Sequence, residues 1–199
     1  FLLSCLMLAA MPVMAAYTGH VYVDKNKNGV FDQSEKPLAG IKVSDGLNVV
    51  ETAADGSFTL PGHERERFIF ITTPSGYKTF NRHYHKIEKK QSGYDFGLIP
   101  YSGRIRKNGS HRYIHIADTE IFNTENHADW VNNVRDYARN EQAAFIIHTG
   151  DICYEKGLKA HIKLMNTETM DCPVFYCIGN HDLVKGKYGE ELFESIYGP

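Results

Sequence analysis

Short apolar runs separated by turn residues fill the first half of the chain. From residue 17 to about residue 97 the runs are HVYV, IKVS, NVVET, SFTL, RFIFITT and YDFGLI, and each is rich in β-branched or aromatic residues. The breaks between them contain Asp-Gly at positions 45–46 and 55–56 and Ser-Gly at 75–76, which are pairs that favour tight turns. This pattern predicts short antiparallel strands that form a small β-sandwich.

The period of the pattern changes after about residue 103. The stretches HRYIHIAD, AFIIHTGD and PVFYCIGNHD have the form of strands, whereas NHADWVNNVRDYARN and KGLKAHIKLMNTETM carry apolar residues at helical spacing. Strands that alternate with helices indicate a parallel sheet with right-handed crossovers. The sequence therefore predicts a multidomain α+β protein, with an antiparallel β-sandwich at residues 16–103 and an α/β domain at residues 104–199.

The first fifteen residues, FLLSCLMLAAMPVMA, are apolar and uncharged and end in small residues before an expected cleavage point. The run is too short to span a bilayer. We expect residues 1–15 to be a bacterial signal peptide, so that the mature protein is periplasmic or extracellular and keeps no transmembrane segment. A membrane anchor and a lipoprotein signal at LLSC are the alternatives.

The charges of the chain are nearly balanced. It has 22 Lys and Arg against 24 Asp and Glu, a formal net charge of −2. Such a balance gives no basis for sequence-independent binding to nucleic acid or to an anionic membrane. Neither is expected as a partner.

The stretch DKNKNGVFDQSE, residues 24–35, matches the twelve-residue calcium loop of an EF-hand. Its flanks, YTGHVYV and KPLAGIKVSDG, predict strands and not the helices of an EF-hand. A strand, loop, strand unit with a structural calcium ion is one interpretation. A hydrated turn is the other, because Asp and Asn readily bond their own backbone. The candidate calcium ligands are Asp24, Asn26, Asn28, Asp32 and Glu35.

Polar residues follow each of the three predicted strands of the second half. Asp118 follows the first strand, Asp151 the second, and Asn180, His181 and Asp182 the third. In a parallel sheet such strand ends lie at one rim, where open α/β sheets bind ligands. Carboxylates, an amide oxygen and an imidazole gathered there predict a site for a hard divalent metal ion.

Two histidines of this half have no ligand spacing of their own. His148 directly precedes Thr-Gly-Asp and is expected to pack in the core, with a supporting role at the site as the alternative. His161 lies in the middle of a predicted helix and is expected to face solvent.

The order of these motifs resembles that of the calcineurin-like metallophosphoesterases. The resemblance rests on Asp118, on Gly-Asp at 150–151 and on Gly-Asn-His-Asp at 179–182, and it covers roughly residues 111–199. The stretch GHVYVDKNKNGVFDQSEKPLAGIKVSDG, followed by TAADGSFTLP, is similar to the prealbumin-like B-type modules of bacterial surface proteins. It also looks like the N-terminal domain found on exported members of this group.

This resemblance implies two divalent metal ions, drawn from Mn, Fe, Mg and Zn, which clamp a phosphate and activate a water. Asp118 would bind the first ion, Asp151 would bridge both and Asn180 would bind the second. His181 would be a catalytic residue beside the leaving-group oxygen, with Asp182 orienting its imidazole.

The sequence departs from the family pattern in two places. Glu120 stands where the family has a histidine ligand; as a ligand it would favour Mn, Mg or Fe over tight zinc binding, and the alternative is that it points away. The family also has a further His and a Gly-His-x-His element downstream of Gly-Asn-His, and this sequence contains neither. We interpret the chain as an incomplete phosphoesterase domain, truncated at both ends, that is expected to be inactive by itself.

The predicted function is metal-dependent hydrolysis of phosphate mono- or diesters by an exported enzyme. The competing hypothesis is a non-catalytic surface or glycan-binding protein with a degenerate phosphoesterase domain, which Glu120 and the missing histidines keep open.

Overall fold

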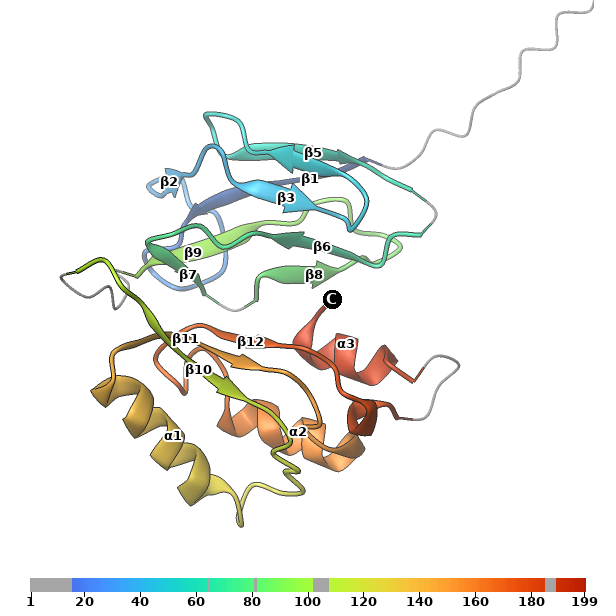
Figure 1. Ribbon diagram of the computed structural model, residues 1–199. Coiled ribbons are helices and arrows are strands. Elements are labelled where there is room, and N and C mark those ends of the chain that lie inside the picture. Colours follow the sequence, from blue (N-terminus) through green and yellow to red (C-terminus); the bar gives the residue numbers. More distant parts are fainter. Residues whose placement is uncertain (1–15, 64, 81, 102–107, 185–188) are drawn as a thin grey trace, which may run out of the picture.

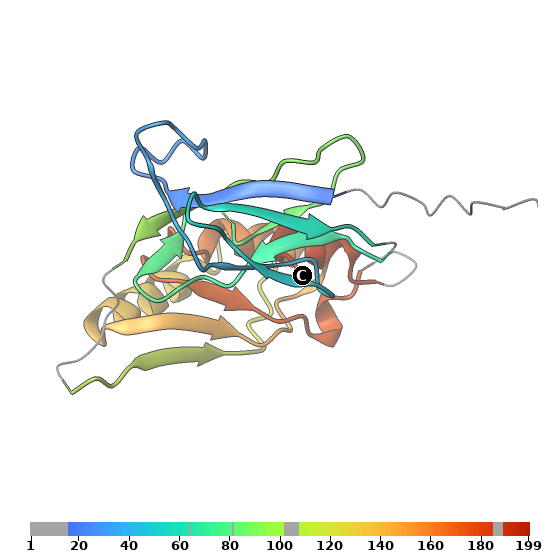
Figure 2. The ribbon, with the colours of Figure 1, turned by 90° about the horizontal axis from the view of Figure 1, so that it is seen from above.

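The structure is a computed structural model that describes residues 16–63, 65–80, 82–101, 108–184 and 189–199 (Figure 1). The predicted signal peptide at residues 1–15 lies outside the described residues. Figure 1 shows a β-rich part above and an α/β part below. Seen from above in Figure 2, the strands of the first part lie over the helices of the second.

Two sheets form the first part, which we call the β module (residues 16–100). One sheet has the order β2-β1-β9-β7, with β5 also paired to β1, and the other has the order β4-β3-β6-β8. All of these pairs are antiparallel except β1 with β9, which is parallel. The strands are β1 (Ala16–Val23), β2 (Lys36–Pro37), β3 (Lys42–Ser44), β4 (Val49–Glu51), β5 (Ser57–Pro61), β6 (Phe68–Ile71), β7 (Tyr77–Thr79), β8 (Tyr84–Lys86) and β9 (Phe96–Pro100).

The core of the β module lies between these sheets. Apolar residues that alternate along the strands point inward, among them Val21 and Val23 of β1, Val43 of β3 and Ile69 of β6. This alternation is the pattern from which a half-buried sheet is predicted. The predicted β-sandwich is confirmed, with one parallel pair that the pattern did not predict.

A three-stranded parallel sheet forms the core of the second part. Its strands are β10 (Arg112–Ile116), β11 (Ala143–His148) and β12 (Val174–Tyr176), and their order in the sheet is their order in the chain. Helix α1 (Ala128–Asn140) connects β10 to β11, and α2 (Tyr154–Leu164) connects β11 to β12. A 3-10 helix η1 (Asn180–Asp182) and helix α3 (Glu191–Tyr197) follow β12. The carboxyl ends of the three strands therefore lie along one rim, as predicted.

Helix α3 joins the two parts. Arg67 Nη2 of the β module lies 2.7 Å from Glu194 Oε1, and the hydroxyl of Tyr84 donates to the carbonyl of Ile196 at 2.9 Å. A side chain at Gly198 would collide with the Tyr84 ring, 2.4 Å from its Cδ1. The end of α3 is thus closely packed against the β module.

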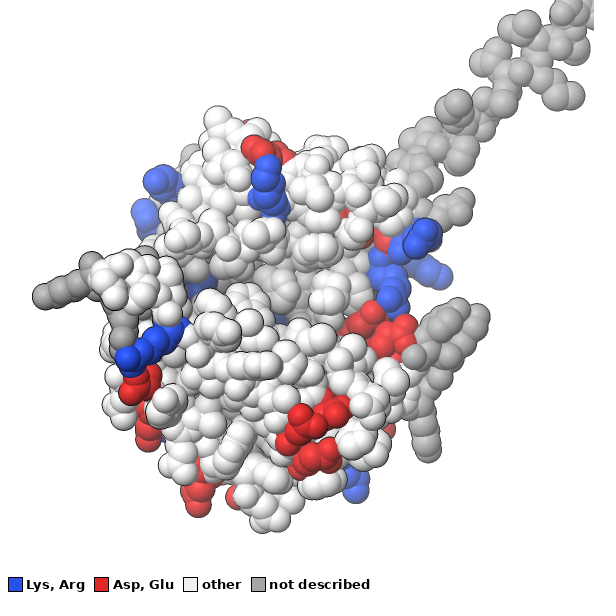
Figure 3. All heavy atoms as spheres, viewed as in Figure 1, with Lys and Arg blue, Asp and Glu red and all other residues white. Residues whose placement is uncertain are grey.

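The surface shows no continuous basic area on the face drawn in Figure 3, as far as the described residues go. Acidic side chains gather on the α/β part of this face, and basic ones lie mainly toward its edges. None of the helices in the described ranges is both long enough and apolar enough to span a membrane.

Candidate active site

The loops that follow the three strands of the α/β part are hydrogen-bonded to one another. The N–H of Asp118 donates to the carbonyl of Gly150 at 3.1 Å, and the N–H of Glu120 donates to that of Asp151 at 3.3 Å. The segment after β12 closes on the same place, because the N–H of His181 donates to Asp151 Oδ1 at 3.0 Å. The structure therefore brings the predicted motifs into one rim.

Two glycines make this approach feasible. A Cβ atom on Gly150 would lie 2.3 Å from the backbone nitrogen of Gly179, and one on Gly179 would lie 2.2 Å from that of Asp151. Gly150 also has φ 97°, a conformation that costs other residues energy. Only residues without a side chain fit at these two positions.

Three of the predicted ligands adopt strained backbone conformations. The φ angles of Asp118, Glu120 and Asp151 are 54°, 49° and 53°. Residues other than glycine seldom occupy this left-handed region, and such strain concentrates at functional sites. The local backbone is thus left-handed at three of the four predicted ligands, whereas the fourth, Asn180, lies in the 3-10 helix η1.

Glu120 points at the imidazole of His181. Its Oε1 lies 2.5 Å from Nδ1 of the ring, and both side chains are partly exposed. The hydrogen bond that Nδ1 of His181 donates to Glu120 raises the pKa of His181. Desolvation opposes this effect, and the charges of Asp151, Glu120 and Asp118 add to it. Tyr154 stacks on the same ring at 5.8 Å between centroids. Glu120 does not point away from the site.

Asp182 has a different role from the predicted one. Its carboxylate is completely buried; Oδ1 accepts the backbone N–H groups of Ile152 (2.7 Å) and Cys153 (2.9 Å), and Oδ2 accepts that of Gly179 (2.9 Å). The Asp182 carboxylate therefore accepts three backbone N–H groups and links the loop after β11 to the loop after β12. The prediction that Asp182 orients the imidazole is corrected: Glu120 makes that contact.

His148 supports the rim from below, the alternative that the sequence left open. Its Nδ1 accepts the N–H of Gly150 at 3.2 Å, so its Nε2 carries the proton and donates to the hydroxyl of Thr119 at 3.0 Å. Burial lowers the pKa of His148 to about 4. A neutral imidazole therefore links the loops of Asp118 and Asp151.

Cys153 is a member of the site that sequence analysis missed. It is buried, and burial together with its hydrogen bond to Glu120 raises the pKa of its thiol to about 11. The one feature of the sequence that could have indicated this is that Cys153 lies two residues after Asp151, in the same loop.

The oxygen-rich donor set of the rim suits a hard divalent ion. Asp118 and Asn180 are exposed, and Glu120 and Asp151 are half-buried. Among the described residues, one group of three His, Cys, Asp or Glu side chains has its donor atoms within 4.8 Å of one another, and it lies in the β module. As a group, the carboxylates of the rim are farther apart than that. The individual ligand roles stay predictions.

The loop at 24–35 connects β1 to β2 in the strand, loop, strand arrangement expected. Asp24 and Glu35 are buried and accept backbone N–H groups: Asp24 those of Asn28 (3.2 Å) and Gly29 (2.9 Å), and Glu35 those of Lys25 (2.8 Å) and Asp32 (3.1 Å). Asp32 Oδ2 accepts the side-chain amides of Asn26 (2.7 Å) and Asn28 (2.9 Å). These hydrogen bonds are the ones expected if the loop is a turn in which Asp and Asn side chains bond the loop's own backbone and amides. Calcium binding stays a prediction.

Two family models match the chain. Residues 25–100 match the N terminal of Calcineurin-like phosphoesterase, and residues 111–198 match Calcineurin-like phosphoesterase itself. The second match contains every candidate residue of the rim. Among curated proteins no significant match was found.

Proposed function

The chain belongs to the calcineurin-like phosphoesterases, a family of metal-dependent phosphoester hydrolases, and we propose on that premise that its rim hydrolyses a phosphate mono- or diester. The observation that carries the proposal is the meeting of the loops of Asp118, Asp151 and His181 through direct hydrogen bonds. Convergence of such loops at the carboxyl ends of parallel strands is where this architecture places ligands.

Asp118, Glu120, Asp151 and Asn180 would hold two divalent ions. When bound, such ions offset the charge of the phosphate and lower the pKa of a water. Four oxygen donors favour Mn, Mg or Fe over tight zinc binding. The Glu120 carboxylate has two oxygens for this purpose; its Oε1 bonds His181, and the carboxylate also interacts with the thiol of Cys153.

His181 is the proton donor of the proposal. Glu120 holds its Nδ1, which leaves Nε2 to face the leaving-group oxygen. The raised pKa keeps the ring protonated to a higher pH than an ordinary histidine. A positioned imidazole of this kind contributes roughly 10²–10⁴-fold to a rate.

The proposal is tested with protein made from the complete gene, purified without metal and supplied with Mn. We expect turnover of p-nitrophenyl phosphate or its bis-ester, loss of turnover in Asp151→Ala, and a lower kcat with little change in KM in His181→Gln. Exposed Glu125→Gln is the control that should keep full activity. Absence of turnover with any divalent metal, alongside binding to a surface glycan, would support the non-catalytic alternative.

Export is a separate proposal. The apolar residues 1–15 motivate it. Mass spectrometry of the mature protein from a periplasmic or culture fraction should find a new N-terminus near Ala16. Recovery of the uncleaved chain from the cytoplasm would contradict it.

A further inference from the structure

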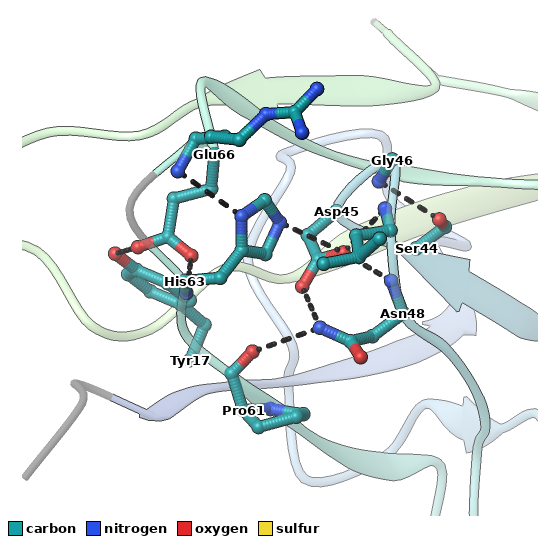
Figure 4. Close-up of polar contacts among 10 residues, drawn as sticks. Tyr17, Ser44, Asp45, Gly46, Asn48, Pro61, His63 and Glu66 are labelled. Atoms are coloured by element: carbon teal, nitrogen blue, oxygen red, sulfur yellow. Dashed lines mark hydrogen bonds and ion pairs between the residues drawn. The ribbon is translucent and has the colours of Figure 1, made fainter.

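Three metal-ligating side chains meet in the β module, outside the rim. Asp45 lies in the turn between β3 and β4, and His63 and Glu66 lie in the connection between β5 and β6 (Figure 4). Each offers one donor atom, and these atoms all lie within 4.8 Å of one another. We propose that Asp45, His63 and Glu66 bind one divalent transition-metal ion.

The turn fixes the first carboxylate in place. The side chain of Asp45 is fully buried; its Oδ1 accepts the backbone N–H groups of Leu47 (2.9 Å) and Asn48 (2.6 Å), and its Oδ2 accepts the side-chain amide of Asn48 (3.0 Å). Burial alone would raise the pKa of Asp45, but the hydrogen bonds from Asn48 and Leu47 outweigh it and lower the pKa. Asp45 is therefore a rigid, ionised donor.

The second carboxylate is also held by neighbours. Glu66 accepts hydrogen bonds from the hydroxyl of Tyr17 and from the backbone N–H of His63. Neither Asp45 nor Glu66 pairs with a lysine or arginine in the part of the chain that the structure describes. Among the basic groups that the structure describes, only His63 lies within ion-pair distance of either carboxylate, with its Nε2 3.4 Å from Asp45 Oδ1.

His63 supplies the independent observation that points to a ligand. Its Nε2 is buried and has no hydrogen-bond partner among the described residues. It lies 3.4 Å from Asp45 Oδ1, too far for a good hydrogen bond. Two donors on a tetrahedral ion with bonds of about 2.1 Å are separated by about 3.4 Å, so this gap matches one edge of such a site.

Binding through Nε2 would change the proton on the imidazole. In the structure Nδ1 of His63 accepts the N–H of Arg65 at 3.2 Å, which leaves the proton on Nε2. A metal on Nε2 moves that proton to Nδ1 and breaks the bond to Arg65, which is long and exposed. One imidazole nitrogen with two carboxylate oxygens suits Zn and its transition-metal neighbours better than Ca or Mg.

The test uses the full-length protein and zinc chloride alone. In an Asp151→Ala background, which weakens the rim, we expect one equivalent of zinc after dialysis, and at least a tenfold weaker affinity when His63→Gln is added. His20→Gln is the matched control: His20 Nδ1 also lies 3.4 Å from a carboxylate, that of Asp95, but both side chains are exposed, and among the residues that the structure describes no third donor joins them. Equal zinc content and affinity with and without His63→Gln would overturn the proposal.

A second measurement covers the case in which His63→Gln does not fold, which circular dichroism would reveal. Zinc is then added to the Asp151→Ala protein while the ring nitrogens of His63 are followed by NMR. A switch from the Nε2–H to the Nδ1–H form at one equivalent is expected. A ring unchanged at ten equivalents would refute zinc binding there, whatever happens at the rim.

Discussion

The carboxylate of Glu120 and the imidazole of His181, which are 61 residues apart in the chain, meet with 2.5 Å between Oε1 and Nδ1. The resemblance to the calcineurin-like phosphoesterases implies a histidine at the position of Glu120, so the sequence has an anionic side chain where a neutral ring is expected. The consequence is a charge-assisted pair that fixes which nitrogen of His181 faces outward.

Replacing Glu120 by Gln should lower the pKa of His181, because the hydrogen bond that His181 donates to the Glu120 carboxylate is the largest cause of its elevation. The measurement is an NMR titration of the histidine rings in metal-free protein. Glu125→Gln, which changes an exposed carboxylate elsewhere, should leave the titration unaltered. An unchanged His181 titration in Glu120→Gln would mean that the pair does not form in solution.

Gly179→Ala should destabilise the rim, since its Cβ would lie 2.2 Å from the backbone nitrogen of Asp151. Backbone cannot give way cheaply, so a loss of about 3 kcal/mol or more in the free energy of unfolding is expected. Gly93→Ala is the control, because a Cβ there meets nothing within 4 Å. Equal unfolding midpoints in urea for the two variants would contradict the observed approach.

Asp182→Asn should act on stability, because one carboxylate oxygen that accepts backbone N–H groups becomes an amide that donates. A loss of about 1–3 kcal/mol is expected for a buried donor left without an acceptor. Urea denaturation measures it, with Glu125→Gln as reference. If Asp182→Asn and the wild type have the same free energy of unfolding, the three hydrogen bonds that Asp182 accepts from the backbone do not contribute to stability.

The location of the site could be predicted from sequence, whereas its contacts could not. Asp118, Asp151 and Asn180 lie in the loops that follow three strands of one parallel sheet, and topology alone gathers such loops at a rim. The contact of Glu120 with His181 depends on the left-handed backbone at residue 120 and on side-chain rotamers. Periodicity carries no information on either.

A second kind of error arose where a helix later in the chain buries a side chain that was predicted to be exposed. His161 was expected to face solvent from the middle of its helix, but it is completely buried, with Nδ1 2.9 Å from the hydroxyl of Tyr197. Tyr197 belongs to α3, which packs on α2 from a distant part of the chain. The trio in the β module was missed likewise, because Asp45 and His63 come from separate turns.

Calcium should raise the melting temperature of the protein if the loop at 24–35 binds it. Asp24 and Glu35 are buried carboxylates close to Asp32, and an ion binding only the folded state stabilises it by mass action. The measurement is thermal unfolding with millimolar calcium and with a chelator, in wild type and in Glu35→Gln. A melting curve indifferent to both additions would leave only the turn in which the side chains bond the loop itself.

The stability of the protein should fall as the pH drops below about 6.5. Burial lowers the pKa of His148 to about 4 and that of His161 to about 3. At a pH between these folded-state pKa values and the ordinary histidine pKa of about 6.5, the two imidazoles bind protons in the unfolded chain but not in the folded chain, so acid favours unfolding. For His161 the loss between pH 7.5 and pH 5 is about 2 kcal/mol. The measurement is urea denaturation of the wild type, His161→Gln and exposed His20→Gln at both pH values. His161→Gln should lose this part of the pH dependence of stability, and His20→Gln should keep it. Identical pH dependence in the three proteins would show that His161 binds protons equally in the folded and unfolded states.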